Sequence, residues 1–166
     1  RLQLRRWRRE AYAVHQGYYA NASRSASCSP CAGGSYQPAS NATGCLPCVP
    51  GAWCAVGASA ALLCDKGTYG NATNLASASE CAPCPEGSSC PTGSATPTQC
   101  DAGSFAPAES AVCSRCAAGR FQAQSGQAGC GECPPGSELL GRDGAECMLA
   151  WQRGERIGQR GMQPMR

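Results

Sequence analysis

Large hydrophobic side chains are sparse along the chain, and the most regularly spaced of them are aromatic. A glycine recurs every 16 to 20 residues, and the residue two positions later is aromatic in six of eight cases. These frame glycines are Gly17, Gly34, Gly51, Gly67, Gly87, Gly103, Gly119 and Gly136. The residues two positions later are Tyr19, Tyr36, Trp53, Tyr69, Ser89, Phe105, Phe121 and Glu138. The regular spacing predicts an array of short repeated units.

The polar stretches between these positions predict turns and short strands rather than helices. A frame glycine suits a residue that turns with positive φ or lets two backbones approach closely. Proline lies after or between cysteines at Pro30, Pro47, Pro50, Pro83, Pro85, Pro91, Pro134 and Pro135. Because proline bars helix and disfavours central strands, we expect β pairings of two or three residues, tight turns and almost no helix. The expected shape is a rod.

The composition cannot supply one large hydrophobic core. Leu, Ile, Val and Phe make up 16 of the 166 residues, whereas Gly and Pro together make up 33. A unit of 16 to 20 residues is also too short to bury a core of its own, so it needs a covalent staple or neighbours to stack on. The chain has 15 cysteines. These features predict a small disulfide-rich fold, an elongated ladder of short Cys-rich repeats with little regular secondary structure.

Fourteen of the cysteines follow one rule. From Gly34 onward a cysteine stands three residues before each frame glycine, and we pair it with the next cysteine along the chain. The expected disulfides are Cys31–Cys45, Cys48–Cys54, Cys64–Cys81, Cys84–Cys90, Cys100–Cys113, Cys116–Cys130 and Cys133–Cys147. Pairing of the first cysteine with the third and the second with the fourth remains open at this point. A closed loop of about 15 residues contributes roughly 3 kcal/mol in the chain-entropy estimate.

Cys28 is left over by this rule. Its partner would stand at position 14, where the chain has Val14. We therefore expect Cys28 to be unpaired within this chain, and to pair outside this segment or with another chain.

Two spacer lengths recur in the array. In the long type, at Gly34, Gly67, Gly103 and Gly119, a polar loop separates the aromatic residue from the closing cysteine. In the short type, at Gly51 and Gly87, the ring closes almost at once at Cys54 or Cys90. We expect each aromatic side chain to lie against a disulfide as the one sizeable apolar contact in its unit.

Three N-glycosylation sequons indicate passage through the secretory pathway. They begin at Asn21, Asn41 and Asn71, and each lies in a loop between an aromatic residue and the following cysteine. We expect the three to occupy equivalent loop positions and to carry N-linked glycans. Together with the number of cysteines, they favour an oxidising, extracellular environment.

The charge is divided between the array and its two ends. The net charge is +3, but residues 10–150 hold five basic and ten acidic residues, a balance of −5. We expect a flexible basic tail over residues 1–16, about eight Cys-rich repeats of 16 to 20 residues over 17–147, and a basic tail or linker over 148–166. The first nine residues are typical of neither a signal peptide nor a membrane span. A polyanion-binding or dibasic processing site at residues 5–9 is the sharper alternative.

The motif Cys31-x-x-Gly34-x-Tyr36 and its copies through Gly136 resemble the ephrin-receptor-like cysteine-rich repeats of the growth-factor-receptor cysteine-rich superfamily. They are also similar in style to the first modules of tumour-necrosis-factor receptors. The resemblance spans about residues 17–147 and implies an extracellular segment of a larger secreted or membrane-anchored, receptor-like protein. The departures from the pattern are Val14, Ser89, Glu138 and Ala150. No part of the chain resembles a kinase domain or an ephrin-binding domain.

Three classes of function compete on these grounds. A structural spacer and protein-binding scaffold, with no cofactor and a protein partner of unknown identity, fits the pattern best. An intracellular zinc-binding protein is the alternative, because Cys28, Cys31, Cys45 and Cys48, and likewise Cys113, Cys116, Cys130 and Cys133, have the spacing of zinc knuckles. An enzyme is disfavoured, since no Cys-x-x-Cys pair precedes a helix-forming run and the single histidine, His15, has no partner motif. The charge split argues against nucleic-acid binding, and membrane attachment is expected only through segments outside this chain.

Overall fold

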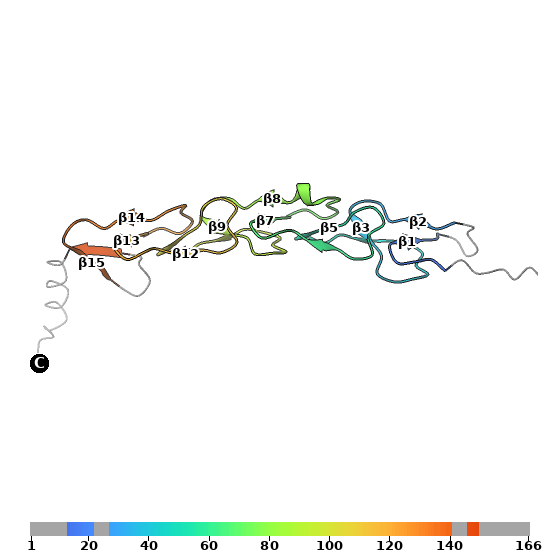
Figure 1. Cartoon of the computed structure of the whole chain (residues 1–166), viewed down its shortest axis with the longest axis horizontal. Helices are drawn as coiled ribbons and strands as arrows, with labels where there is room; N and C mark the ends of the chain where they lie inside the picture. The colour runs from blue at the N-terminus through green and yellow to red at the C-terminus, as the bar shows by residue number, and fades with distance from the viewer. Residues whose placement is uncertain (1–12, 22–26, 141–145, 150–166) are drawn as a thin grey trace, which may run out of the picture.

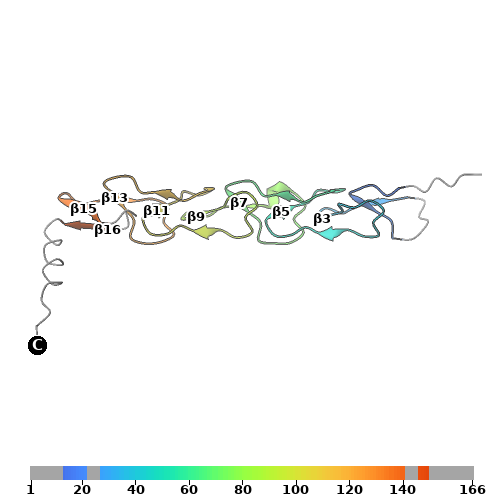
Figure 2. The same cartoon turned by 90° about the horizontal axis from the view of Figure 1, so that it is seen from below.

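The structure, a computed structural model, describes residues 13–21, 27–140 and 146–149. Over these residues the chain forms one long, narrow rod with the N-terminal and C-terminal units at opposite ends (Figure 1). The outline stays narrow in the perpendicular view (Figure 2). The described residues form eight two-stranded antiparallel sheets and no α-helix, which confirms the predicted small disulfide-rich fold.

Each repeat unit contributes one hairpin. Unit 1 begins at Val14, and units 2 to 8 begin at Cys31, Cys48, Cys64, Cys84, Cys100, Cys116 and Cys133. The first strands are β1 (Tyr18–Tyr19), β3 (Ser35–Tyr36), β5 (Ala52–Trp53), β7 (Thr68–Tyr69), β9 (Ser88–Ser89), β11 (Ser104–Phe105), β13 (Arg120–Phe121) and β15 (Ser137–Leu140). Their partners are β2 (Ser29–Pro30), β4 (Leu46–Pro47), β6 (Leu62–Leu63), β8 (Ala82–Pro83), β10 (Thr98–Gln99), β12 (Ser114–Arg115), β14 (Gly131–Glu132) and β16 (Glu146–Leu149).

The strands are as short as the sequence predicts, except at the last hairpin. Seven hairpins pair two residues with two, as in Tyr36 opposite Leu46, whereas β15 and β16 pair four with four. The one helical element of the described residues is a 3₁₀ turn, η1 (Ala78–Glu80), in the loop of unit 4. In units 2 to 7 the first strand is at least partly buried in five cases, and the second strand is mainly exposed.

A tight turn at the frame glycine starts each hairpin. All eight frame glycines have φ between +74° and +84°. In each unit the residue after the frame glycine donates its N–H to the carbonyl of the residue two positions before that glycine. In unit 3, Ala52 N–H donates to the Val49 carbonyl at 3.2 Å. This pattern is that of a type II turn, which requires positive φ at its third residue. The glycine carbonyl then accepts the N–H of the next unit's first residue, as Gly51 does from Cys64 at 2.9 Å.

Consecutive units are joined by main-chain hydrogen bonds in a repeated pattern. Between units 3 and 4, Gly51 N–H donates to the Gly70 carbonyl at 2.7 Å, and Cys54 N–H donates to the Leu75 carbonyl at 2.8 Å. In return, Asn74 N–H donates to the Cys48 carbonyl at 3.0 Å. The same three bonds join every pair of neighbours from units 1 and 2 to units 6 and 7. The rod is therefore held along its length by a regular backbone ladder.

Buried side chains occur in each of units 1 to 6. Most of them are cysteines of units 2 to 6, and the residue after the aromatic position is fully buried at Cys54, Cys90 and Ala106. In unit 2 that residue is Gln37, 8% exposed, whose amide nitrogen donates to the Gly44 carbonyl at 2.6 Å and whose amide oxygen accepts from Ala39 N–H at 3.0 Å. Both ends of the buried amide are thus satisfied, as burial of a polar group requires.

Candidate functional site

The disulfide ladder is the chemically distinctive feature of this chain. Seven disulfides lie at Cys31–Cys45, Cys48–Cys54, Cys64–Cys81, Cys84–Cys90, Cys100–Cys113, Cys116–Cys130 and Cys133–Cys147. The structure thereby brings together the same seven pairs that the nearest-cysteine rule selects. Each disulfide closes a loop inside one unit, and none crosses between units. Covalent stapling therefore fixes the units, and the backbone ladder joins them.

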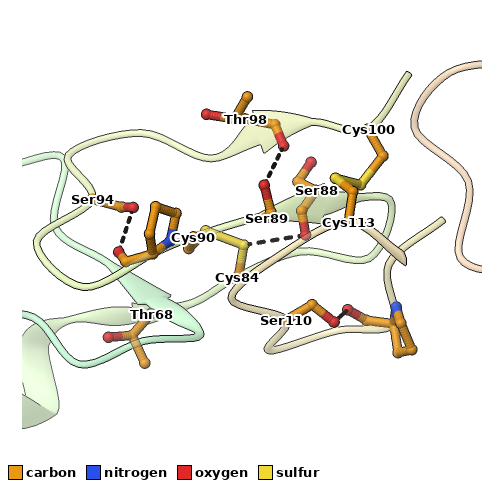
Figure 3. Close-up of a disulfide and its surroundings, with 12 residues drawn as sticks. Thr68, Cys84, Ser88, Ser89, Cys90, Ser94, Thr98, Cys100, Ser110 and Cys113 are labelled. Atoms are coloured by element: carbon orange, nitrogen blue, oxygen red, sulfur yellow. Dashed lines mark hydrogen bonds between the residues drawn. A yellow bond between two sulfur atoms is a disulfide. The ribbon is translucent and has the colours of Figure 1, made fainter. Parts of the chain in front are cut away.

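The two short-loop disulfides are the most protected. Cys48 and Cys54 are completely buried, and Cys84 and Cys90 are nearly so. Figure 3 shows the second of these with loops of neighbouring units around it; the Ser94 hydroxyl there donates to the Pro91 carbonyl at 2.6 Å. All four cysteines of units 7 and 8 are partly exposed instead.

Unit 1 has no disulfide among the described residues. Cys28 is free and partly buried, and Val14, at the position its partner would occupy, is buried at 8% exposure. Val14 belongs to the segment expected to be a tail ending at residue 16, yet it starts the ladder. His15 is exposed, and its carbonyl accepts the N–H of Tyr18 in the first turn.

Two aromatic side chains pack against the disulfide-bearing cluster of the following unit. Tyr36 of unit 2 packs against the cluster of Cys48, Ala52 and Cys54 in unit 3. Trp53 of unit 3 packs against the cluster of Cys64, Leu75 and Cys81 in unit 4. These contacts extend the expectation of one apolar contact within each unit, because they reach the next unit. Because the ladder sets each first strand against the following unit, the ring reaches forward and couples neighbours.

A second set of positive-φ residues was missed by sequence reasoning. We call these the loop-turn residues: Asn41 (φ +57°), Gly57 (+73°), Asn74 (+63°), Gly93 (+80°), Glu109 (+61°) and Gly126 (+73°). Each donates its N–H to the carbonyl of the first residue of the preceding unit. The sequence signal that could have identified them is their spacing, since each stands six or seven residues after a frame glycine. Three residue types share the role, which hides it from a search for identical residues.

The loop-turn residues also explain why the frame positions need glycine. A Cβ at Gly51 would overlap the carbonyl oxygen of Gly93, two units further on. Gly17, Gly34, Gly67 and Gly87 meet the carbonyl oxygens of Gly57, Asn74, Glu109 and Gly126 in the same way. These five frame glycines therefore serve both expected purposes, a positive-φ turn and a close backbone approach.

The three sequon asparagines are exposed, but they are not equivalent. Asn21 and Asn71 each stand two residues after an aromatic residue, Tyr19 and Tyr69. Asn41 stands five residues after Tyr36 and is a loop-turn residue. The expectation of three equivalent positions is wrong for Asn41. Glycosylation of the three stays a prediction, and residues 22 and 23 of the first sequon lie outside the described residues.

The zinc alternative is not favoured by the arrangement of the cysteines. Of the two candidate quartets, every member except Cys28 is in a disulfide, so its sulfur is not a thiolate ligand. In the part of the chain that the structure describes, no group of three or more His, Cys, Asp or Glu side chains is placed to hold a metal ion.

Exposed apolar side chains gather in two neighbouring units. Among the described residues, seven large hydrophobic side chains are exposed, and five of them belong to units 2 and 3: Leu46, Val49, Val56, Leu62 and Leu63. The corresponding second strands of units 5 to 7 carry polar residues; there Arg120 and Glu132 form an exposed cross-strand ion pair at 3.1 Å. The surface thus changes from apolar to polar along the rod.

The basic tails fall on residues 1–12 and 150–166, outside the described residues. No helix within the described ranges has the length and hydrophobicity needed to cross a membrane.

Comparison with known families points to one of them. Residues 103–141 match the family described as "Tyrosine-protein kinase ephrin type A/B receptor-like". The matched residues run from the frame glycine of unit 6 into unit 8, and units 2 to 5 repeat the same turn and disulfide pattern. The comparison with curated proteins finds no match. Together with the seven disulfides, the family match identifies an ephrin-receptor-like cysteine-rich repeat in this chain.

Proposed function

We propose that this chain is a non-enzymatic extracellular segment of a larger secreted or membrane-anchored, receptor-like protein, in which it acts as a rigid spacer and protein-binding scaffold. The observation that carries the proposal is the unbroken backbone ladder. The same three hydrogen bonds recur at six successive interfaces, from Gly17 bonded to Gln37 through Gly103 bonded to Gln122. A stack whose units each contact only their neighbours extends in one direction and holds its two ends apart.

An extracellular location is supported by what holds each unit together. The second strand of every described hairpin from unit 2 to unit 7 is mainly exposed, so little apolar burial remains if a disulfide opens. Structural disulfides persist in oxidising compartments and are reduced in the cytosol. The exposed sequon asparagines Asn21, Asn41 and Asn71 fit the same route.

The scaffold role is supported by the exposed apolar side chains of units 2 and 3. Leu62 is 50% exposed and Leu63 is 58% exposed, on a strand whose equivalents elsewhere carry proline or polar residues. Single exposed hydrophobic residues are common, but five within two adjacent short units favour contact with another protein. We assign this surface to an extracellular protein partner.

Intact mass tests the compartment and the chemistry together. The chain is produced in a secretory host, free thiols are alkylated, glycans are removed, and the mass is compared with and without reduction. Fourteen protected cysteines, a single alkylated Cys28 and no bound zinc are expected. A folded sample with all 15 cysteines open to alkylation and zinc bound would overturn the compartment, the fold and the function.

The spacer role is tested by removing two whole units. Deleting residues 64–99 takes out units 4 and 5 with both of their disulfides, and it joins unit 6 to a short-type unit, as in the native chain. The maximum dimension measured by small-angle X-ray scattering should shorten in proportion to the units removed. An unchanged maximum dimension contradicts the spacer role. A broad distribution of maximum dimensions within one sample contradicts its rigidity.

The binding role is tested by measuring how well the purified segment attaches to the surface of cells that express the parent protein. Leu62→Lys combined with Leu63→Lys should abolish attachment of the purified segment, whereas Val112→Lys, at an exposed valine of unit 6, should not. Equal binding of both variants would remove units 2 and 3 as the contact surface.

A further inference from the structure

Units 3 and 5 carry two loops of matched geometry. Nine residues lead from the closing cysteine to the next unit in each, residues 55–63 in unit 3 and 91–99 in unit 5. Both loops turn at a positive-φ glycine, Gly57 or Gly93, and both end in a two-residue strand, β6 or β10. Chemical differences between the two loops therefore come from their side chains.

The unit 5 loop carries threonine where the unit 3 loop exposes apolar side chains. Val56 and Leu62 of unit 3 are 71% and 50% exposed. Thr92 and Thr98 occupy the same two positions in unit 5, and both are exposed. Thr96 stands between them and is exposed as well. The unit 5 loop thus presents three threonine side chains to solvent.

The remaining threonines of the chain are engaged elsewhere. The chain has six threonines in all. Thr43 and Thr73 each complete an N-glycosylation sequon, and the Thr68 hydroxyl donates to the Asp65 carbonyl at 2.7 Å. Half of the threonines are therefore concentrated in one nine-residue loop, where neither a sequon nor a hydrogen bond accounts for them.

The hydroxyls of these three threonines are available for reaction. Within the described residues, Thr92, Thr96 and Thr98 make no side-chain hydrogen bond. The Ser94 hydroxyl of the same loop instead donates to the carbonyl three residues earlier at 2.6 Å. In Figure 3 the Thr98 side chain points away from Ser89, whose hydroxyl bonds the Thr98 main-chain carbonyl. Modification of the threonines would therefore break no structural hydrogen bond, whereas modification of Ser94 would.

Two prolines shape the backbone around the threonines. Pro91 precedes Thr92 directly, and Pro97 follows Thr96 directly. A residue before proline is held in an extended conformation, and Thr98 continues the extended backbone in strand β10. Segments that combine Ser and Thr with Pro are typical of mucin-type O-glycosylation.

We propose that the unit 5 loop is an O-glycosylation site of the mucin type, with Thr92, Thr96 and Thr98 as the acceptors. In each modification the threonine Oγ1 forms a bond to the anomeric carbon of an N-acetylhexosamine supplied by a nucleotide sugar. The bond from that carbon to the diphosphate breaks, the nucleoside diphosphate leaves with the bonding electrons, and the hydroxyl proton is released to solvent. The proposal rests on the proposed extracellular function, because such glycans are added in the secretory pathway.

Mass analysis of the full chain tests the site. The chain is secreted from a host that makes mucin-type glycans, and its N-linked glycans are removed enzymatically. A fragment that covers residues 91–99 should retain one or more N-acetylhexosamine increments, and fragmentation should place them on threonine. An unmodified fragment, or increments found on Ser94 alone, would overturn the proposal.

Variants of the two matched loops sharpen the test. The combined variant Thr92→Ala, Thr96→Ala and Thr98→Ala should lose every increment on this fragment, whereas Ser94→Ala should keep them. Ala60→Thr with Ala61→Pro copies the Thr96-Pro97 pair into the unit 3 loop and should gain an increment there. Failure of that gain would overturn the assignment of Thr96 in particular.

The state of the cysteines separates this proposal from the proposed function. Secreted chain with its seven disulfides formed but unmodified threonines overturns the O-glycosylation site and leaves the extracellular scaffold standing. Folded chain with reduced cysteines contradicts the proposed function itself.

Discussion

Units 3 and 7 have the same turn and a disulfide each, yet their surroundings differ. In unit 3, both cysteines are completely buried, and the carbonyl oxygen of Gly93 lies against Gly51. In unit 7, Cys116 and Cys130 are partly exposed, and a Cβ at Gly119 would meet open space. The φ angles of the two frame glycines are nearly equal, +83° and +81°. The conformation of the turn is therefore set within each unit. The burial of the unit's cysteines and frame glycine depends on the units that follow it.

The largest expected effect comes from removing a disulfide, and it distinguishes the contribution of sulfur burial from that of loop closure. The chain-entropy estimate ranks the 14-residue loop of Cys116–Cys130 above the 6-residue loop of Cys48–Cys54, at about 3 against about 2 kcal/mol. Burial reverses the order, because removing the sulfurs of Cys48 and Cys54 leaves a cavity that costs about 2 kcal/mol more. Denaturant unfolding should show a loss of about 4 kcal/mol for the Cys48→Ala, Cys54→Ala pair and about 3 kcal/mol for the Cys116→Ala, Cys130→Ala pair.

Hydrogen exchange locates the same effect. Protection should fall in the altered unit and its neighbours while distant units stay protected, as nearest-neighbour coupling requires. A larger loss for the unit 7 pair, or a loss spread evenly over all units, contradicts this account.

Alanine at the frame glycine should show the two-unit contact directly. Gly51→Ala adds a Cβ that must displace the Gly93 carbonyl, whereas Gly119→Ala bears only the cost of positive φ. The expected losses in unfolding free energy are about 3 to 4 kcal/mol and about 1 to 2 kcal/mol. Guanidinium titration with the disulfides intact measures both, and equal losses would show that the approach from two units away contributes nothing.

The aromatic contact should be felt in the following unit. Trp53→Ala removes a ring that packs against Cys64, Leu75 and Cys81, with an expected loss of about 2 to 3 kcal/mol. Phe121→Ala, at the equivalent half-buried position of unit 7, should cost about 1 kcal/mol. Mapping of reduced cysteines under mild reductant should find the unit 4 disulfide opening faster in Trp53→Ala. Faster opening of the unit 3 disulfide instead would show that the Trp53 ring protects the disulfide of its own unit.

The smallest expected effect is a gain. Glu109 holds φ +61°, where a side chain is strained, so Glu109→Gly should stabilise the chain by about 1 kcal/mol. Glu86→Gly, at a residue without positive φ, should destabilise it by about 0.5 to 1 kcal/mol instead. Matched thermal or denaturant unfolding measures the pair, and a loss at Glu109 would mean that its side chain has a stabilising contact.

Features confined to one unit were predictable from sequence, because their signals lie within one repeat. The turn at Gly51 follows from the glycine and its spacing from Cys48, and the short strands follow from the surrounding prolines. The first cysteine of each unit from 2 to 8 pairs with the next cysteine along the chain, and the loops so closed span 6 to 17 residues.

Features between units were not predictable, since they depend on how successive hairpins stack. The forward contact of Trp53 with the next unit and the approach of Gly93 to Gly51 both require that stacking to be known. The loop-turn residues were hidden because Gly, Asn and Glu all fill the role. In the sequence Asn41 is one sequon asparagine among three, and its positive φ and its side-chain bond to Val14 set it apart in the structure.

The confinement of every disulfide to a single unit bears on how the rod responds to mechanical force. A pull on its two ends loads the hydrogen bonds between units first, because no disulfide among the described residues crosses an interface. Once an interface opens, the disulfide still closes its loop of 6 to 17 residues, so those residues cannot extend under the force. Such a rod would lengthen in small steps, one interface at a time, and each unit would keep the staple from which to re-form its hairpin when the tension falls.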